Sequence, residues 1–427
     1  MFLFQVSNLL SHRLVKTGLL YSVTSTIYSV CTLIAGFVIL RWVDPVLLGL
    51  WQSIAIANYY LPILQLGIHS GLNLELPIVL GENNIEQAQK LVKTGLYYAV
   101  FLSFIMLVIG LFAFIYVYCN SYDSKIVYGV ISVCIIAISS NVKMHYVATY
   151  RSAGAFSKLS LINLLSSIAA LIMICFIYFY QYEGMLLYYV FTDAIYTLSL
   201  YVYAPYRKIS PKFYKDTFVV LLKRGVYMTT VNQILQCIQS VPRILLLRFG
   251  SITQVGLFHP ALVVGTFINM LPAQLVQFLQ PQMGFKYGQT QRAKDMWRYL
   301  LYLTVLTPIF SLPFVVIGWI CLPYVFEVFF PKYIEAITPI RVMLIGFVFS
   351  STYMSQNFLS TIKAYTEVII FQIFSLVCFV AFPYFMIKMY PEDLLTSMAI
   401  GMSFAYFVTY IVNAFLVRYT VFKNKYN

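Results

Sequence analysis

The chain has 427 residues, of which 61% are hydrophobic and only 10% are charged. Soluble domains have about 45–50% apolar and about 25% charged residues, so this composition excludes an ordinary soluble protein. The formal net charge is +14, which would suggest nucleic acid as a partner if the protein were soluble. The seven cysteines occur singly and show no metal-binding or redox spacing.

Twelve apolar stretches fill the sequence, and each is long enough for a helix that crosses a bilayer, which takes about 20 residues. Backbone groups in hydrocarbon must form their hydrogen bonds within the segment, so helices are expected. The first stretch is too long for a signal-peptide core and is interpreted as an uncleaved span. The predicted spans are 18–40, 46–66, 94–118, 126–148, 158–180, 184–204, 226–247, 253–279, 298–321, 336–360, 366–388 and 394–417. The sequence therefore predicts an all-α polytopic membrane protein.

The basic residues are distributed unevenly over the two faces of this predicted bundle. Twenty-one Lys and Arg fall on the side that carries both termini, and five fall on the other side. Cytoplasmic loops of membrane proteins carry such an excess, so both termini are predicted to be cytoplasmic. Membrane topology and anionic lipid headgroups explain the positive net charge, so no nucleic-acid partner is expected.

The second half of the sequence repeats the first at a constant shift in residue number, which places Gly225 on Gly18. Six spans in each half give the halves the same orientation, which is typical of parallel repeats related by an axis along the membrane normal. The expected organisation is an N-terminal lobe at 1–205, a basic cytoplasmic linker at 206–225 and a C-terminal lobe at 226–427. Other pairs that coincide under the same shift include Arg41 with Arg248, Gly49 with Gly256, and Gly81 with Gly288.

The seventh span carries a polar stripe at helical periodicity, and the first span carries smaller polar residues on the equivalent arc. Two such stripes would line a water-filled cleft. The competing interpretation is that these groups hydrogen-bond between packed helices. The stripe of the seventh span comprises Thr229, Asn232, Gln233, Gln236, Gln239, Ser240 and Arg243, and that of the first comprises Ser22, Ser25, Thr26, Ser29, Thr32 and Gly36.

Charged residues within the predicted spans are few, because charge there is costly. Arg243 and Arg341 lie in the outer parts of spans seven and ten, and either a cavity or snorkelling to headgroups would accommodate them. Lys143 lies near the inner end of span four and is expected to snorkel. Asp193 lies near the middle of span six, which indicates a paired or functional carboxylate. No histidine has a catalytic neighbour in sequence and no phosphate-binding glycine motif occurs, so no catalytic and no metal-binding residues are predicted.

The residues of spans one to three carry a resemblance to a known family. The segments RWVDPVLLGLWQS and LQLGIHSGLNLELPIVLGENN are similar to the opening third of bacterial oligosaccharide-lipid flippases, the Wzx type of polysaccharide-biosynthesis protein. The similar positions are Arg41, Gly49, Trp51, Gln52, Gly67, Gly71, Pro77 and Gly81. The resemblance implies the fold of the multidrug and oligosaccharidyl-lipid exporter superfamily, in which two six-helix lobes form a MATE-like V around a central cavity.

The resemblance also implies a function and a cellular location. A flippase of this type moves undecaprenyl-pyrophosphate-linked repeat units of O-antigen or a similar polysaccharide across the bacterial cytoplasmic membrane. Other polysaccharide-assembly proteins of the membrane are conceivable partners. The polar stripe and Ser29 would contact sugars, and Arg243 and Arg341 would contact the pyrophosphate. Coupling to H⁺ or Na⁺ through Asp193 is a hypothesis, and no other cofactor is expected.

Two alternative functions stay open at this stage. A drug or cation exporter of the same fold would favour acidic residues in its cleft, where this sequence offers Asp193 alone. A glycan polymerase or ligase would be expected to have a large external loop, whereas the outer loops here are among the shortest segments. The chain is therefore expected to be a transporter and not an enzyme.

Overall fold

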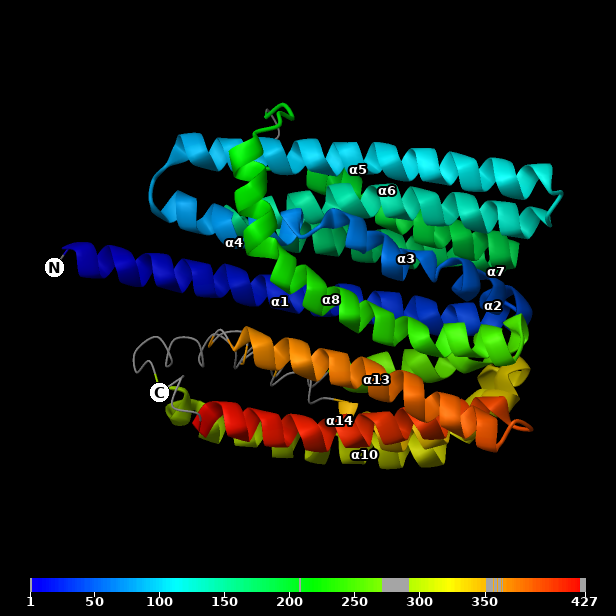
Figure 1. Cartoon of the computed structure of the whole chain (residues 1–427). Coiled ribbons are helices and arrows are strands. Elements are labelled where there is room, and N and C mark those ends of the chain that lie inside the picture. The colour runs from blue at the N-terminus through cyan, green and yellow to red at the C-terminus, as the bar shows by residue number, and fades with distance from the viewer. Residues whose placement is uncertain are drawn as a thin grey trace. The chain divides into compact units, whose positions relative to one another are not determined.

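The structure is a computed structural model of the whole chain, and it describes residues 2–206, 209–270, 292–350, 356, 359, 362 and 364–422. Its elements are all helical in this part of the chain (Figure 1). They are α1 (Phe2–Trp42), α2 (Pro45–Ile54), α3 (Ala57–Tyr60), η1 (Leu61–Gln65), α4 (Ile68–Gly81), α5 (Ile85–Cys119), α6 (Ser124–Ser152), α7 (Phe156–Val202), α8 (Lys215–Phe249), a helix Ile252–Met270, η2 (Ala293–Met296), α10 (Trp297–Phe329), η3 (Pro331–Ala336), α11 (Ile337–Val348), α13 (Tyr365–Met389) and α14 (Leu394–Phe422).

The predicted fold class is confirmed, because the twelve apolar stretches fall mainly on helix wherever they are described. Within the described residues, nine helices are long and apolar enough to cross a membrane. The number is lower than twelve in part because α7 carries two predicted spans, which meet at Gln181 with φ 44°. Helix α8 is not among the nine, since its polar stripe lowers its hydropathy. The ends of the predicted spans at 253–279 and 336–360 lie in part outside the described residues.

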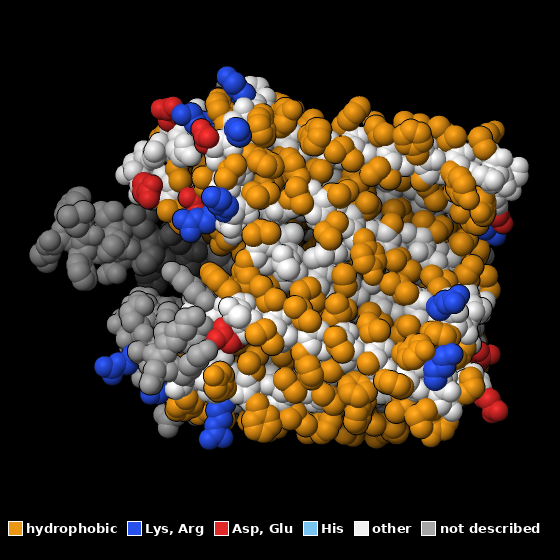
Figure 2. All heavy atoms as spheres, in the orientation of Figure 1, with side chains coloured by type: hydrophobic (Ala, Val, Ile, Leu, Met, Phe, Trp, Pro, Cys, Tyr) orange, Lys and Arg blue, Asp and Glu red, His pale blue; other side chains and the backbone are white. Residues whose placement is uncertain are grey.

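The hydrophobic side chains cover the visible face along the middle of the helices, and charged side chains gather near the helix ends (Figure 2). Soluble proteins rarely expose large continuous apolar surfaces. Exposed large apolar residues occur on every long helix whose side chains are described, including Phe112 on α5, Phe179 on α7 and Phe415 on α14. Such a surface fits lipid, so the chain is a multi-pass membrane protein.

The internal repeat is visible in where the helices begin and end. Helix α1 ends at Trp42 and α8 ends at Phe249, and the constant shift found in the sequence places these two ends on each other. The next helices begin at Pro45 and at Ile252, which coincide under the same shift. Both starts are capped by a side chain, since Asp44 accepts a hydrogen bond from the backbone of Val46 at 3.0 Å and Ser251 exchanges two hydrogen bonds with Gln254.

Helix α4 is a difference from the sequence interpretation, which placed residues 67–81 in a cytoplasmic loop. The chain turns sharply after η1, because Leu66 and Gly67 have φ of 49° and 88°, and then continues as a helix through Pro77. The following helix is capped by a side chain, since Asn84 accepts a hydrogen bond from the backbone of Gln87 at 3.0 Å. Helix α8 runs through Pro242 to Phe249.

The chain divides into two compact units that exchange short segments. Unit 1 comprises Met1–Val43 and Ile54–Gln233, and unit 2 comprises Asp44–Ser53 and Ile234–Asn427. The first unit therefore holds the amino-terminal half of α8, and the second holds most of α2. The predicted lobes at 1–205 and 226–427, with a linker at 206–225, stay a prediction.

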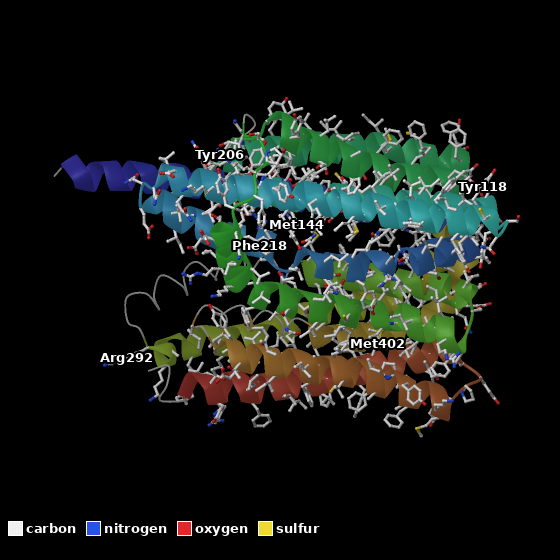
Figure 3. All side chains as sticks on the ribbon, turned by 45° about the horizontal axis from the view of Figure 1, so that its top comes forward. Tyr118, Met144, Tyr206, Phe218, Arg292 and Met402 are labelled. Carbon is white, nitrogen blue, oxygen red and sulfur yellow. The ribbon has the colours of Figure 1, made fainter. Side chains whose placement is uncertain are left out.

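The core of unit 1 forms where α4 packs against α5, α6 and the start of α8. Ile68, Leu72 and Leu76 of α4 are fully buried there, together with Leu91 of α5 and Leu221 of α8. Tyr206 and Phe218, near the start of α8, cover this core from one side (Figure 3). In the same unit α1 lies along α7, and α7 lies along α6. In unit 2, α14 contacts α10, α11 and α13.

Two helix crossings bring backbone against backbone, and both require glycine. In unit 2 a Cβ built at Gly49 would lie 1.9 Å from the carbonyl oxygen of Ile252, and one built at Gly256 would lie 1.9 Å from that of Pro45. The contact is thus symmetric under the internal repeat. In unit 1 a Cβ at Gly225 would lie 1.8 Å from the carbonyl oxygen of Gly67. Small residues at such crossings let membrane helices approach closely.

The crossing in unit 2 gives the first testable prediction. The substitution Gly49→Ala should lower the melting temperature in detergent by several degrees, because overpacking costs about 1–3 kcal/mol and exceeds the gain of about 1 kcal/mol in helix propensity. Gly18→Ala in α1 is the matched control, since a Cβ there has nothing within 4 Å. Circular dichroism during heating measures both. Equal melting temperatures for the two variants would contradict the crossing.

Candidate functional site

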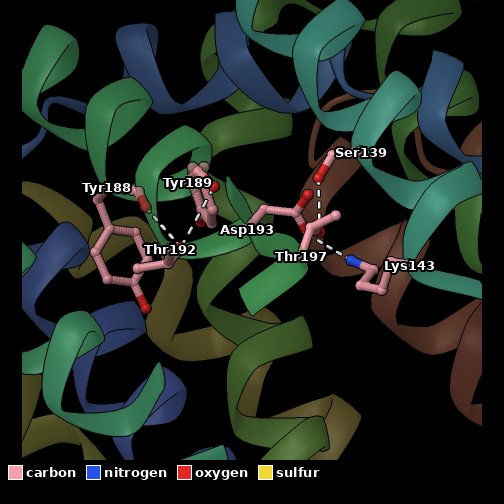
Figure 4. Close-up of polar contacts among 7 residues, drawn as sticks. All are labelled: Ser139, Lys143, Tyr188, Tyr189, Thr192, Asp193 and Thr197. Atoms are coloured by element: carbon pink, nitrogen blue, oxygen red, sulfur yellow. Dashed lines mark hydrogen bonds and ion pairs between the residues drawn. The ribbon is translucent and has the colours of Figure 1, made fainter. Parts of the chain in front are cut away.

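An ion pair between α6 and α7 lies in the membrane-spanning part of unit 1. Lys143 of α6 donates a hydrogen bond to Oδ1 of Asp193 on α7 (Figure 4). Their side chains are 28% and 16% exposed. Beside the pair, the hydroxyls of Ser139 and Thr197 are hydrogen-bonded at 2.8 Å and join the same two helices. The sequence expectation that Lys143 snorkels to the inner headgroups is therefore wrong, and Asp193 is paired.

A second group of polar contacts joins α7 to α1 in the same unit. Asn163 of α7 donates a hydrogen bond from Nδ2 to Ser25 Oγ at 2.9 Å, and its Oδ1 accepts one from Tyr196 at 3.4 Å. Arg151 of α6, which is predicted to lie on the cytoplasmic side, donates a hydrogen bond to the Tyr21 hydroxyl at 3.5 Å. Part of the stripe on the first span is thus used between packed helices, as the competing interpretation expected.

The remaining hydroxyls of the α1 stripe bond to their own helix. Ser22, Thr26 and Ser29 each donate to the carbonyl oxygen four residues earlier, at 2.9–3.1 Å, and Thr32 donates to the carbonyl of Ser29 at 2.9 Å. Such a bond satisfies the hydroxyl donor in a membrane helix and leaves the oxygen able to accept. Ser29 is exposed on unit 1, so a role in contacting sugars stays a prediction for it.

The amino-terminal half of the α8 stripe belongs to unit 1. Gln233 is buried and donates from Nε2 to the carbonyl oxygen of Tyr59 at 2.8 Å. Thr229 shares a hydrogen bond of 2.9 Å with Ser70 of α4. Asn232, by contrast, is exposed on this unit. Gln233 and Thr229 therefore bind helices together, whereas Asn232 keeps its predicted role as a proposal.

The carboxyl-terminal half of the stripe belongs to unit 2 and contains a buried guanidinium. Arg243 is only 7% exposed, and it donates from Nε to Gln52 Oε1 at 3.0 Å and from Nη1 to the carbonyl oxygen of Gln239 at 2.9 Å. His259, on the helix Ile252–Met270, is half-buried and lies close enough to Arg243 to interact with its charge. Gln236 is half-buried, and Gln239 is exposed.

Arg341 on α11 has a different environment from Arg243. Its guanidinium lies over the Trp319 ring at 5.6 Å from the centroid, and its Nε and Nη2 donate to the carbonyl oxygen of Trp319 at 3.3 Å. This stacking on a tryptophan holds the cation against α10. The predicted contact of Arg341 with a pyrophosphate stays a prediction.

Sequence reasoning missed the partners of the charged residues. Lys143 and Asp193 are 50 positions apart, and Gln52 and Arg243 are 191 apart. Opposite charge within two apolar spans was the only available signal for the first pair. For the second pair, nothing in the sequence indicated that Gln52, a polar residue of the second span, would accept a hydrogen bond from Arg243. Within the described ranges, no group of three His, Cys, Asp or Glu could hold a metal ion.

No family model and no curated protein sequence matches this chain. Solved structures do match it. The chain is similar to a multidrug resistance MATE family transporter of the MOP superfamily in its inward-facing conformation, with a TM-score of 0.75 and 15% identity over 93% of this chain and 94% of that one. The fold is that of MATE transporters.

Two further MATE structures show the same likeness. An outward-facing multidrug resistance MATE transporter of the MOP superfamily has a TM-score of 0.66 at 15% identity, with 95% of each chain covered. A MATE structure in complex with MaD3S has a TM-score of 0.65 at 14% identity, covering 96% of this chain and 95% of that one. The MATE-like architecture predicted from the sequence is thereby confirmed as a fold.

The ion pair of unit 1 gives the second prediction. Lys143→Met leaves the Asp193 carboxylate without its ammonium partner and should lower stability by about 1–3 kcal/mol, below the cost of breaking a fully buried pair. The double variant Lys143→Met, Asp193→Leu should recover most of that loss, because no unpaired charge remains. Thermal unfolding of both single variants and the double variant measures the coupling. Additive losses would contradict a pair.

Proposed function

We propose that this chain is a membrane exporter that works by alternating access. The observation that carries the proposal is the MATE fold over almost the whole chain, because this fold has been solved in both inward-facing and outward-facing conformations. Charged and amide side chains on spanning helices support it, since such groups usually mark a substrate or ion pathway.

For the cargo, the fold likeness supports a small molecule moved in exchange for H⁺ or Na⁺. The solved neighbours include multidrug resistance transporters, and this is the candidate that the comparisons favour. Asp193 is then the proposed ion-coupling residue. A cation or proton that binds its carboxylate would compete with Lys143, and binding would thereby release α6 from α7.

The charges of the described helices favour a second candidate, a lipid-linked oligosaccharide carried to the outer leaflet of the bacterial cytoplasmic membrane. A cationic drug needs a carboxylate that is free to pair with it, but Asp193 is paired with Lys143, and Glu75 of α4 is paired with Arg224 at 3.1 Å. A pyrophosphate would instead be attracted by the buried Arg243 guanidinium. Asn232, Gln236 and Gln239 would offer amide partners to sugars in this proposal.

Reconstitution separates the two cargoes and gives the third prediction. Proteoliposomes should be loaded either with a fluorescent polyprenyl-pyrophosphate oligosaccharide or with the organic cation ethidium. For a flippase, the glycolipid becomes accessible to a headgroup-modifying enzyme on the far side, and ethidium does not move. The reverse result would establish the small-molecule exporter. Movement of neither cargo, with folded protein and an imposed H⁺ or Na⁺ gradient, would contradict the proposed function.

The fourth prediction concerns Arg243. If its charge attracts an anionic headgroup, Arg243→Ala should reduce initial transport of the glycolipid at least tenfold, whereas transport of a neutral-headgroup analogue should change little. Arg248→Ala is the matched control, because Arg248 lies on the same helix and is exposed. Arg243→Lys keeps the charge but not the two-nitrogen geometry, so it should restore transport only in part. Equal losses with both cargoes would instead indicate that Arg243 only holds α8 to Gln52.

A further inference from the structure

Two histidines meet inside unit 1, at a place that the proposed transport site does not use. His69 lies in the first turn of α4 and His145 lies on α6. They are 2% and 1% exposed, and their ring centroids are 6.3 Å apart with the ring planes at 76°. Thr94 of α5 is also completely buried, and its neighbour Gly95 contacts the His145 ring: a Cβ there would lie 3.1 Å from Nδ1.

These buried groups are not satisfied by the protein around them. Neither ring nitrogen of His69, nor Nδ1 of His145, nor the Thr94 hydroxyl hydrogen-bonds to any residue that the structure describes. Buried polar atoms in proteins are nearly always hydrogen-bonded to protein or to ordered water. A water bonded to one nitrogen of each ring would lie about 4 Å from each centroid, so a separation of 6.3 Å suits one bridging water.

The groups that face the pair supply no compensating negative charge. From α5, the Tyr98 ring lies 6.4 Å from His69, and its hydroxyl donates to the carbonyl oxygen of Leu64. From α6, the Tyr146 ring contacts His145 at 5.3 Å, and Tyr201 of α7 lies behind Tyr146. On the α8 side, Glu75 of α4 is already paired with Arg224. An imidazolium is therefore disfavoured while this packing stays closed, and becomes favourable only when water enters.

Helix α6 connects the pair to the ion pair described above. Lys143 precedes His145 by two positions, which places the two side chains on roughly opposite faces of α6. One face is bonded to Asp193 on α7, and the other lies against His69 on α4. A shift of α6 that hydrates the histidines would therefore also disturb the ion pair.

We propose that His69 and His145 bind one proton between them, and that this proton is coupled to export in addition to any ion at Asp193. The coupling of this proton to export rests on the proposed function, whereas its binding to the two histidines does not. The proton has a higher affinity for the state in which α4, α5 and α6 admit water, so its binding shifts the chain towards that state. Two imidazoles and a hydroxyl fall short of the ligand set of a structural metal site, which leaves a proton as the fitting ligand.

The first experiment measures the proton without any cargo. Purified protein with ¹⁵N-labelled histidine is titrated between pH 5 and pH 8 in detergent, and His69→Gln and His145→Gln variants assign the ring signals. The two rings should titrate together, with an uptake of one proton per molecule that either variant abolishes. His259→Gln, which removes a half-buried histidine of unit 2, should leave this uptake unchanged. Rings that stay neutral down to pH 5, or that titrate independently, would overturn the inference.

The second experiment measures coupling in proteoliposomes with whichever cargo the wild type moves. A pH gradient should stimulate transport by the wild type and by His259→Gln. The gradient should stimulate transport at least fivefold less in His69→Gln and His145→Gln than in the wild type. Transport by these two variants without a gradient should stay within twofold of the wild-type rate. Stimulation that persists in both variants, or that is lost only in Asp193→Asn, overturns the inference. A wild type that moves no cargo contradicts the proposed function, and the histidine titration still decides the proton site.

Discussion

The constraint on which this structure depends is that polar groups buried in an apolar bundle need partners, either in the protein or in ordered water. Lys143 and Asp193 satisfy it by pairing, and Arg243 satisfies it through Gln52 and the carbonyl of Gln239. The small hydroxyls of α1 satisfy it through their own backbone. Each solution ties particular helices together, so the distribution of polar residues decides which helices can separate easily and which cannot.

Much of the fold could be predicted from the sequence, because hydrophobic length and the repeat are local or periodic signals. The helix ends at Trp42 and Phe249 fall in register with the internal repeat. Helix α4 escaped prediction, since its polar residues and Pro77 are typical of a loop outside the membrane. Its burial depends on α5, α6 and α8, which no local pattern reports.

The site could be predicted only as a set of residue types. Periodicity placed Asn232, Gln236 and Arg243 on one face of α8, but it could not distinguish side chains that hold helices together from those that stay exposed. That distinction depends on pairings such as Gln233 with Tyr59, which are 174 positions apart. Two glycines of the segments that resemble flippases have a physical explanation, because Gly49 and Gly67 lie where two backbones touch.

The exchange of Asp44–Ser53 into unit 2 has a consequence for how the chain matures. Gly49 must wait for Ile252 and Gly256, which the ribosome adds about two hundred residues later. Until then the Gly49 surface of α2 lacks its partner helix during membrane insertion. A nascent chain that is stopped after its first half would therefore be an incomplete assembly, recognisable to membrane quality control by this unmatched surface.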